Sequence, residues 1–274
     1  MKKLISLLLL LTPLFHKPPI SRPNCEMYEK NTPCYEACQE SYRAISYPQG
    51  SRNSQIHFDK AIELCEDFAY AYHEKAVPYL KRGDFITWRA LMDKAVALEP
   101  EERLGYRGWC RYQFLRDYQG AIDDIERLDE MVDYDIGYAQ NGDCHLIVAK
   151  ALAYKGLGQD DKALSILEAF VADPDFYALP YDLLHLGVMY LEKGDLDKAL
   201  KTLNEQNNVN PQLADNYYYL ARVYQALGNQ SEARKQIAQC ITYYDQGLYR
   251  KDVYTTPMDA VSRAQVEALA RQLE

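Results

Sequence analysis

The chain has 274 residues, of which 48% are hydrophobic and 26% are charged, and its formal net charge is −9. This is the composition of an ordinary soluble protein, long enough for one or two domains with a real core. The acidic balance argues against general nucleic-acid binding, which needs a basic surface. Tyrosine is abundant, at 24 residues, and its ring suits both interfaces and packed helical repeats.

Residues 1–24 are predicted to be a signal peptide and leader. Two lysines precede an apolar run over 4–15, which is too short to span a bilayer and is interrupted by Pro13. We therefore expect an exported protein, periplasmic or associated with a bacterial envelope. Cys25 could instead carry the lipid of a bacterial lipoprotein and attach the chain to a membrane, although small residues do not precede it as such a site requires.

The chain repeats itself at an interval of 34 residues. Residues 58–61 align with 92–95, and Tyr72 aligns with Tyr106. Within each unit the apolar residues fall at i, i+3, i+4 and i+7, which is one face of a helix, and a turn with glycine follows. A second apolar stripe completes a helical hairpin, which cannot bury its face alone and must stack on its neighbours.

The clearest units cover residues 180–213 and 214–247. Each has a large residue, a leucine followed by a small residue, a tyrosine, a turn glycine, and an alanine on the second helix. In residues 180–213 these are Leu183, Leu186, Gly187, Tyr190, Gly194 and Ala199. This pattern resembles the tetratricopeptide repeat (TPR) family. The resemblance implies an all-α, right-handed α-solenoid of about six helical hairpins over residues 35–247, with a capping helix at the C-terminus.

The hairpins are expected to form two blocks. An N-terminal block of three hairpins covers 25–131, an insertion follows over 132–143, and a C-terminal block of three hairpins covers 144–247. Residues 248–274 are expected to form a linker and the capping helix, which would begin with Thr256 as its N-cap.

Two residues and one missing glycine depart from the family pattern. Trp88 stands where the family has alanine, and Pro78 lies inside a first helix, so the hairpin that contains them is expected to be kinked or spread. The third unit lacks its turn glycine before Asp117.

Seven cysteines occur without a CxxC pair, which leaves thioredoxin chemistry and the common zinc spacings without support. In a hairpin the start of the first helix lies beside the end of the second. Cys65 is therefore predicted to bond Cys34 or Cys38, preferably Cys38, whose position faces the second helix, and Cys25 could take the remaining partner. The cysteines at two small-residue core positions are expected to be buried free thiols; they are Cys110 and Cys240.

No catalytic motif is present. The five histidines form no HExxH pair, and the sequence has no GxSxG, Walker or GxGxxG pattern, which removes the common hydrolase, phosphate and dinucleotide signatures. We therefore expect no enzymatic activity, no metal site and no cofactor.

In TPR arrays the first helices line a concave groove. The cations and tyrosines at the corresponding positions are Arg43, Tyr70, His73, Arg107, Arg111, Lys155, Tyr181, Tyr218 and Arg222. They predict a protein or peptide partner with an acidic or C-terminal segment, because arginine pairs well with carboxylates; the alternative is that they form an ordinary solvated helix surface. The family's carboxylate clamp for chaperone C-termini is absent, since Gln39, Arg43 and Glu74 occupy its positions.

The sequence therefore predicts a non-enzymatic, protein-binding TPR scaffold or adaptor in the bacterial envelope, without nucleic-acid partners. Two alternatives stay open. One is a regulator that senses a small peptide in its groove. The other is a TPR lipoprotein that acts as an assembly factor of the outer membrane or pilus, which differs mainly by lipidation at Cys25.

Overall fold

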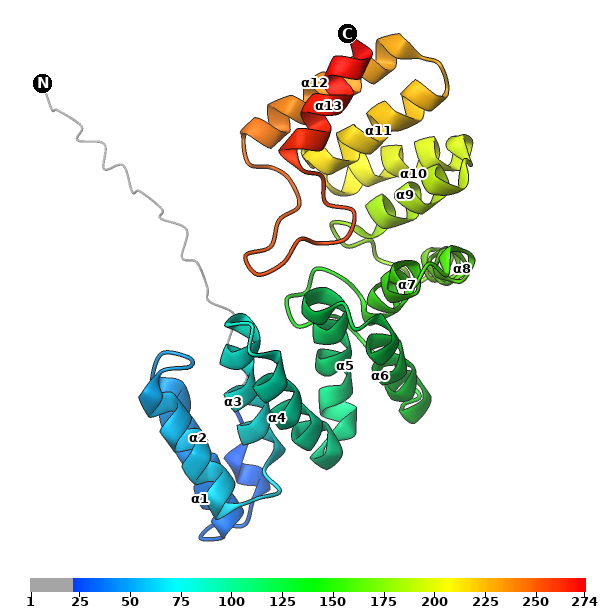
Figure 1. Cartoon of the computed structure of the whole chain (residues 1–274). Coiled ribbons are helices and arrows are strands. Elements are labelled where there is room, and N and C mark those ends of the chain that lie inside the picture. The colour runs from blue at the N-terminus through cyan, green and yellow to red at the C-terminus, as the bar shows by residue number, and fades with distance from the viewer. Residues whose placement is uncertain (1–21) are drawn as a thin grey trace, which may run out of the picture. The chain divides into compact units, whose positions relative to one another are not determined.

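The computed structural model describes residues 22–274, so nearly all of the predicted signal peptide lies outside the described residues. The described part is all-α, as predicted: it contains thirteen α-helices and no β-strand, only an isolated bridge between Tyr138 and His145. The helices, labelled in Figure 1, are α1 (Pro33–Ser46), α2 (Arg52–Leu64), α3 (Ala69–Lys81), α4 (Phe85–Leu98), α5 (Pro100–Cys110), α6 (Tyr118–Met131), α7 (Leu146–Gly156), α8 (Asp160–Val171), α9 (Asp182–Lys193), α10 (Leu196–Val209), α11 (Ala214–Ala226), α12 (Gln230–Asp245) and α13 (Arg263–Leu273).

The hairpin of α9 and α10 shows why the repeat folds as it does. Gly194 ends α9 at φ +80°, a backbone conformation that glycine adopts without steric cost, and Asp195 then caps α10 by accepting from the Lys198 N–H. Gly187 lies so close to Leu203 that an added Cβ would come within 2.6 Å of that side chain. Small residues are therefore required where the two helices cross.

The repeated alanine is a packing residue in every hairpin. Each copy on a second helix has 0% exposure; the residues are Ala61, Ala95, Ala121, Ala163, Ala199 and Ala233. The 34-residue period therefore reflects close helix packing. Trp88, which replaces a small residue in α4, is also fully buried.

The described residues divide into two compact units, the first ending at Glu74 and the second beginning at Lys75, within α3. The predicted insertion at 132–143 is therefore not where the compact units separate. Helix α6 packs directly on α7 across this segment, because each hairpin must bury its apolar face on the next.

The first unit contains two disulfides. Cys34 is bonded to Cys65, and Cys25 is bonded to Cys38. The preference for a Cys38–Cys65 bond was wrong. Cys38 lies one turn deeper in α1, where the 3₁₀ turn Cys25–Met27 packs against that helix, so Cys34 at the helix start is the residue that reaches the end of α2.

In the second unit successive hairpins stack into a solenoid. Helices α5 and α6, α7 and α8, α9 and α10, and α11 and α12 pair as hairpins, and α13 covers α12. The capping helix begins at Arg263, later than expected: Ser262, not Thr256, is its N-cap, and Ser262 forms a capping box with Gln265. Residues 249–261, called the return segment here, are not helical and run back along the preceding hairpins (Figure 1).

Candidate functional site

The return segment lies against the first helices of four successive hairpins in the second unit. In Figure 1 it descends from α12 towards the end of α5 and returns to α13. The side chains that hold it come from α11, α9, α7 and the turn after α5; they are Asp215, Tyr219, His185, Lys155 and Arg116. The face that these first helices form therefore binds a non-helical stretch of the same chain that runs along it and turns back.

Asp259 is the most densely held residue of the segment. Its Oδ1 accepts a hydrogen bond from Lys155 Nζ at 2.8 Å, and its Oδ2 accepts from His185 Nδ1 at 2.7 Å. Its carbonyl accepts from the Tyr219 hydroxyl at 3.3 Å. The Asp259 backbone has φ +61°, which is uncommon for a residue with a side chain but tolerated by aspartate. The contacts thus fix both the carboxylate and the turn that presents it.

Arg250 is the second buried anchor, with 5% exposure. One guanidinium nitrogen donates to His185 Nε2 and to the Met258 carbonyl. The guanidinium also lies over the Tyr181 ring, 4.7 Å from its centroid, in a favourable cation–π arrangement. Arg250 therefore joins the two parts of the return segment that run along the hairpins, its own and that of Met258, called the limbs here, to α9.

Asp215, at the start of α11, binds the segment through its backbone. Its two carboxylate oxygens accept from the N–H groups of Arg250 and Val261, each at 2.7 Å. One residue earlier, the Ala214 N–H donates to the Leu248 carbonyl at 2.8 Å. These are bonds to main-chain groups, which any extended peptide could offer.

The far end of the segment meets the third hairpin, where the turn glycine is missing. The chain instead forms a π-helical turn over Arg111–Leu115, and Arg116 takes the left-handed conformation at φ +56°. The Arg116 guanidinium donates to the Thr256 carbonyl, and the Phe114 and Tyr254 rings meet edge to face. A departure from the repeat pattern thus coincides with a contact to the return segment.

The protonation states follow from the geometry. Burial alone would raise the pKa of Asp259, but the hydrogen bond from His185 and the charge of Lys155 outweigh burial and hold it at about 2. Burial and the nearby Arg250 charge lower the pKa of His185 to about 4. Near neutral pH the cluster therefore holds a charged lysine, a charged aspartate and a neutral histidine whose proton is on Nδ1, because Nε2 accepts from Arg250.

Asp182, at the first position of α9, is buried beside this cluster with 1% exposure. Its Oδ2 accepts from the Leu179 N–H at 2.9 Å, whereas Oδ1 has no hydrogen-bond partner among the described residues. Burial raises the pKa of this carboxyl to about 6. The ionised form of the Asp182 carboxyl is therefore unfavourable in the folded protein near neutral pH.

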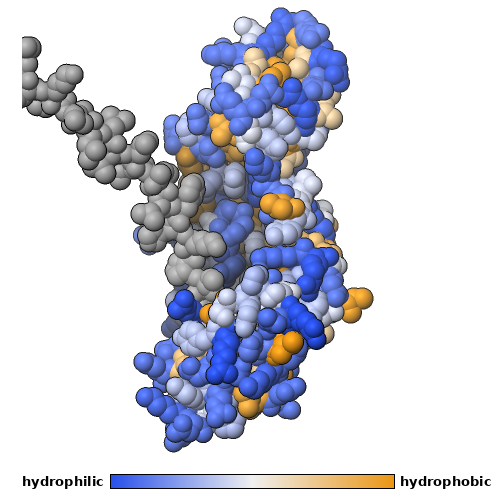
Figure 2. All heavy atoms as spheres, turned by 90° about the vertical axis from the view of Figure 1, so that its left-hand side faces the viewer, coloured by the Kyte–Doolittle hydropathy of each residue, from blue (hydrophilic) through white to orange (hydrophobic). Residues whose placement is uncertain are grey.

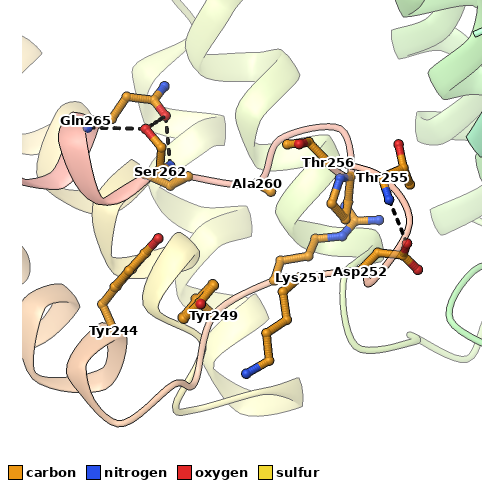
Figure 3. Close-up of a pocket in the computed structure, with 12 residues that line it drawn as sticks. Tyr244, Tyr249, Lys251, Asp252, Thr255, Thr256, Ala260, Ser262 and Gln265 are labelled. Atoms are coloured by element: carbon orange, nitrogen blue, oxygen red, sulfur yellow. Dashed lines mark hydrogen bonds between the residues drawn. The ribbon is translucent and has the colours of Figure 1, made fainter. Parts of the chain in front are cut away.

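The return segment also encloses a shallow pocket of about 260 Å³ with α12 and α13. Figure 3 shows the Ser262–Gln265 capping box at one side of the pocket and the Asp252–Thr255 turn at the other. Tyr244 and Tyr249 stack in parallel, with centroids 4.2 Å apart. The segment is therefore anchored at its limbs and is not packed as a solid core between them.

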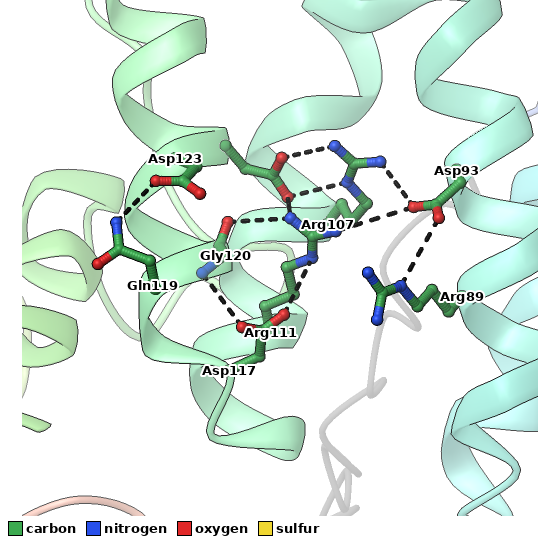
Figure 4. A network of polar contacts seen from close by, with 9 residues as sticks. Arg89, Asp93, Arg107, Arg111, Asp117, Gln119, Gly120 and Asp123 are labelled. Carbon is green, nitrogen blue, oxygen red and sulfur yellow. Dashed lines mark hydrogen bonds and ion pairs between the residues drawn. The ribbon is translucent and has the colours of Figure 1, made fainter. Parts of the chain in front are cut away.

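Two of the predicted groove cations are internal structural residues. Arg107 donates to both carboxylate oxygens of Asp124, at 2.8 and 2.5 Å, and to Asp93 at 2.8 Å. Arg111 pairs with the same Asp124 at 2.9 Å and with Asp117 at 3.6 Å (Figure 4). Arg107 and Arg111, predicted as groove cations, are each only 11% exposed, because neighbouring helices contribute aspartates that neutralise and cover them.

The other predicted groove residues are in different environments. Lys155 and Tyr181 contact the return segment, as described above, and Tyr218 is buried. Arg222 is exposed on α11, where it shares a helix face with Asp215 and Tyr219 by its spacing. The remaining three lie in the first unit: Arg43 pairs with Glu40 at 2.7 Å and is mostly exposed, and Tyr70 and His73 are buried.

The residues that sequence reasoning missed are the acceptors and donors that hold the segment, namely His185, Asp215, Tyr219, Arg250 and Asp259. Asp215 and Tyr219 are polar residues that lie among apolar ones on one helix face. This pattern could have predicted that they belong to a site. Nothing in the local sequence marks Arg250, which lies in the expected linker, or Asp259, which was expected in the first turn of the capping helix.

No group of three or more His, Cys, Asp or Glu side chains in the described part of the chain could hold a metal ion. Over the same residues, the helices are all too short or too polar to cross a membrane. Figure 2 shows one face of the molecule as mostly hydrophilic, with hydrophobic residues in small separate patches. Where the described residues of this face are in view, their hydrophobic side chains form no broad patch.

Comparison with known proteins supports the same class of architecture. The tetratricopeptide repeat family model matches residues 183–205 and 215–246. The structure of PilW, a widely conserved type IV pilus biogenesis factor, has a TM-score of 0.60 at 18% identity, covering 77% of this chain and 94% of that one. YrrB, a TPR protein with an unusual peptide-binding site, has a TM-score of 0.50 at 21% identity, covering 69% and 92%.

A tetratricopeptide repeat protein from Parabacteroides merdae covers 89% of this chain and 86% of its own, with a TM-score of 0.52 at 14% identity. A search of curated proteins found no match. The stacked hairpins define a helical-repeat protein whose first helices hold a segment of the same chain. The chain carries tetratricopeptide repeats over residues 183–205 and 215–246, and its fold is that of solved tetratricopeptide repeat proteins.

Proposed function

We propose that the chain is an exported, non-enzymatic scaffold that binds an extended segment of a partner protein on the face formed by α5, α7, α9 and α11. The observation that carries this proposal is that the same face already holds a non-helical polypeptide, the return segment. Groups from four consecutive hairpins contact it, and many of the bonds go to main-chain atoms. A surface with this arrangement can bind other extended chains in the same way.

The partner segment is acidic or ends in a free carboxylate. Lys155 and His185 together bind the Asp259 carboxylate of the return segment, and Arg222 adds an exposed cation on α11. Arg107 and Arg111 do not contribute, because the aspartates around them use their charge. The likeness of YrrB, which has a peptide-binding site by its description, is consistent with this role.

An oxidising compartment is the proposed location. Four of the seven cysteines form two disulfides, and disulfides persist in exported proteins but are rare in the reducing cytosol. The charged and apolar N-terminal residues of the sequence favour the same compartment. PilW, whose fold is similar, is described as a pilus biogenesis factor, so a role in assembly at the envelope is a second candidate.

Lipidation at Cys25 and the Cys25–Cys38 disulfide are mutually exclusive, because each uses the same sulfur atom. We therefore propose a chain without a lipid on Cys25. Mass spectrometry of the N-terminal peptide from exported protein, with and without reduction, decides the matter. A lipidated Cys25 would favour the lipoprotein alternative.

Selection of peptides from a displayed library against the folded full chain tests the binding function. We expect acidic peptides, with affinity that falls as salt rises, because exposed charges are screened. Arg222→Glu should weaken their binding at least tenfold, whereas Lys201→Glu, an exposed change on α10, should not. If no peptide is selected, or if both variants weaken binding equally, the proposed binding face is wrong.

A further inference from the structure

We propose that the return segment is a built-in competitor for the partner: it occupies the binding face, and a partner segment displaces it only by supplying a carboxylate to Lys155 and His185. This inference rests on the proposed function and adds the chemistry and the regulation of the same face.

The bonds that hold the segment are those of a peptide ligand. Asp215 and Ala214 bind main-chain N–H and C=O groups at residues 248, 250 and 261. The Tyr219 hydroxyl binds the main-chain carbonyl of Asp259. Main-chain bonds are the general means by which proteins bind extended peptides, so a foreign segment can replace each of them.

The middle of the segment is open to solvent. Val253 is 91% exposed and Tyr254 is 54% exposed. Asp252 accepts only from the N–H groups of Tyr254 and Thr255, within the segment itself. A pocket lies beneath the segment on its α12 and α13 side. Apart from the contacts of Tyr254 with Phe114 and of Thr256 with Arg116, this middle part is not packed against the helices, so the segment can leave the face without unfolding them.

Displacement has a specific chemical requirement at Lys155. The lysine side chain is 13% exposed and pairs with Asp259, which is 6% exposed, and with Glu192. Removing Asp259 without replacement would leave the buried His185 imidazole N–H without its acceptor and the largely buried Lys155 ammonium with Glu192 alone, which is unfavourable. A carboxylate in the competing segment restores both charge-assisted bonds. An apolar or basic segment does not.

Tethering sets the strength of this competition. Both ends of the segment continue into helices that remain packed, so the segment is present at the face at an effective concentration in the millimolar range. Weak partners are therefore excluded, and a partner with matching backbone and carboxylate groups is selected.

Hydrogen exchange of the full wild-type chain tests whether the segment can leave. We expect the Arg250 and Val261 amides, which donate to Asp215, to exchange at least tenfold faster than the interior amides of α9 and α11. This result would show that the segment opens while the helices stay folded. Exchange at the same rate as these helix amides would overturn the proposal, because the segment would then be a fixed part of the core.

A second experiment tests the carboxylate requirement with a defined probe. Residues 249–261 are replaced in the full chain by a glycine–serine linker of equal length, and a synthetic peptide of residues 248–262 is added. We expect the peptide to bind the replaced chain and to bind wild type at least tenfold more weakly. The Asp259→Asn peptide should bind at least tenfold more weakly than the native one, and the Asp252→Asn peptide should bind like the native one.

Lack of peptide binding by a replaced chain of native helicity, or equal binding of the Asp259→Asn peptide, would overturn the proposal. If the replaced chain does not fold, the exchange measurement decides by itself. The two proposals fail in distinguishable ways. If the synthetic peptide binds but the library yields no peptide, only the proposed function is contradicted. If selected peptides bind the wild-type chain and the replaced chain equally well, only the proposal that the return segment competes with the partner is contradicted.

Discussion

Lys155 on α7 and Asp259 in the return segment are 104 residues apart in sequence, and their side chains form an ion pair with a 2.8 Å separation between Nζ and Oδ1. The pair joins the fourth hairpin to a segment that follows the sixth. The pair is largely buried, so removal of either charge is more destabilising than it would be in an exposed pair.

The first prediction concerns this pair. Lys155→Met should lower the free energy of unfolding of the second unit by about 3 kcal/mol, because it leaves the Asp259 carboxylate buried without its cation. It should also speed proteolytic cleavage at the exposed Val253–Tyr254 tip. Urea unfolding and limited proteolysis measure the two effects. Lys193→Met, which removes a lysine paired with the exposed Asp161, should change stability by less than about 0.5 kcal/mol; equal effects of both changes would contradict the prediction.

The second prediction concerns the buried Asp182 carboxyl, whose pKa is raised to about 6. The folded state holds its proton at pH values where the unfolded state has lost it, so this group's contribution to stability falls as pH rises from about 3.8 through 6. Asp182→Asn has no such loss. The variant should therefore be more stable than wild type by up to about 3 kcal/mol at pH 7.5, and by much less at pH 4.5.

Urea midpoints of the two chains at both pH values measure this difference. His185, whose pKa is lowered to about 4, contributes a slope of the opposite sign, but it does so in both chains and largely cancels. The same substitution at the exposed Asp160, at the start of α8, serves as the control. A pH-independent difference for Asp182→Asn would show that the carboxyl is not the titrating group.

The third prediction concerns Arg107, which was expected to be a groove cation. Arg107→Met should destabilise the second unit by about 3 kcal/mol, because Asp124, only 3% exposed, loses a bidentate partner. Arg222→Met on the exposed side of α11 should cost less than about 0.5 kcal/mol. Thermal unfolding followed by circular dichroism compares the two. A small effect of Arg107→Met would mean that Arg111 alone is enough to hold Asp124.

The fourth prediction concerns the cysteines. Peptide mapping without reduction should find Cys34 linked to Cys65 and Cys25 linked to Cys38. Replacing Cys34 and Cys65 together by alanine should cost the first unit about 2–4 kcal/mol. Burial raises the pKa of the other three thiols, that of Cys240 to about 12, so alkylation should modify these only after unfolding. A Cys38–Cys65 peptide would contradict the structure.

The sequence by itself determined the repeat and its packing. Ala61 and Ala95 recur because two helices must approach closely, and Gly194 recurs because the turn needs a left-handed backbone. These requirements act within one hairpin or between adjacent hairpins, so the same residue types recur in the sequence at the repeat interval. The buried thiols at Cys110 and Cys240 could be predicted for the same reason.

Only the tertiary structure decided how charges are used. Arg107 and Lys155 were both expected to be groove cations, yet Asp124 neutralises one, and Asp259, which was expected in the first turn of the capping helix, neutralises the other. Cys38 was preferred as the partner of Cys65, but it is bonded to Cys25, and Cys34 is bonded to Cys65. The physical reason is that an ion pair or a disulfide depends on where two distant segments meet, and no period in the sequence encodes that meeting.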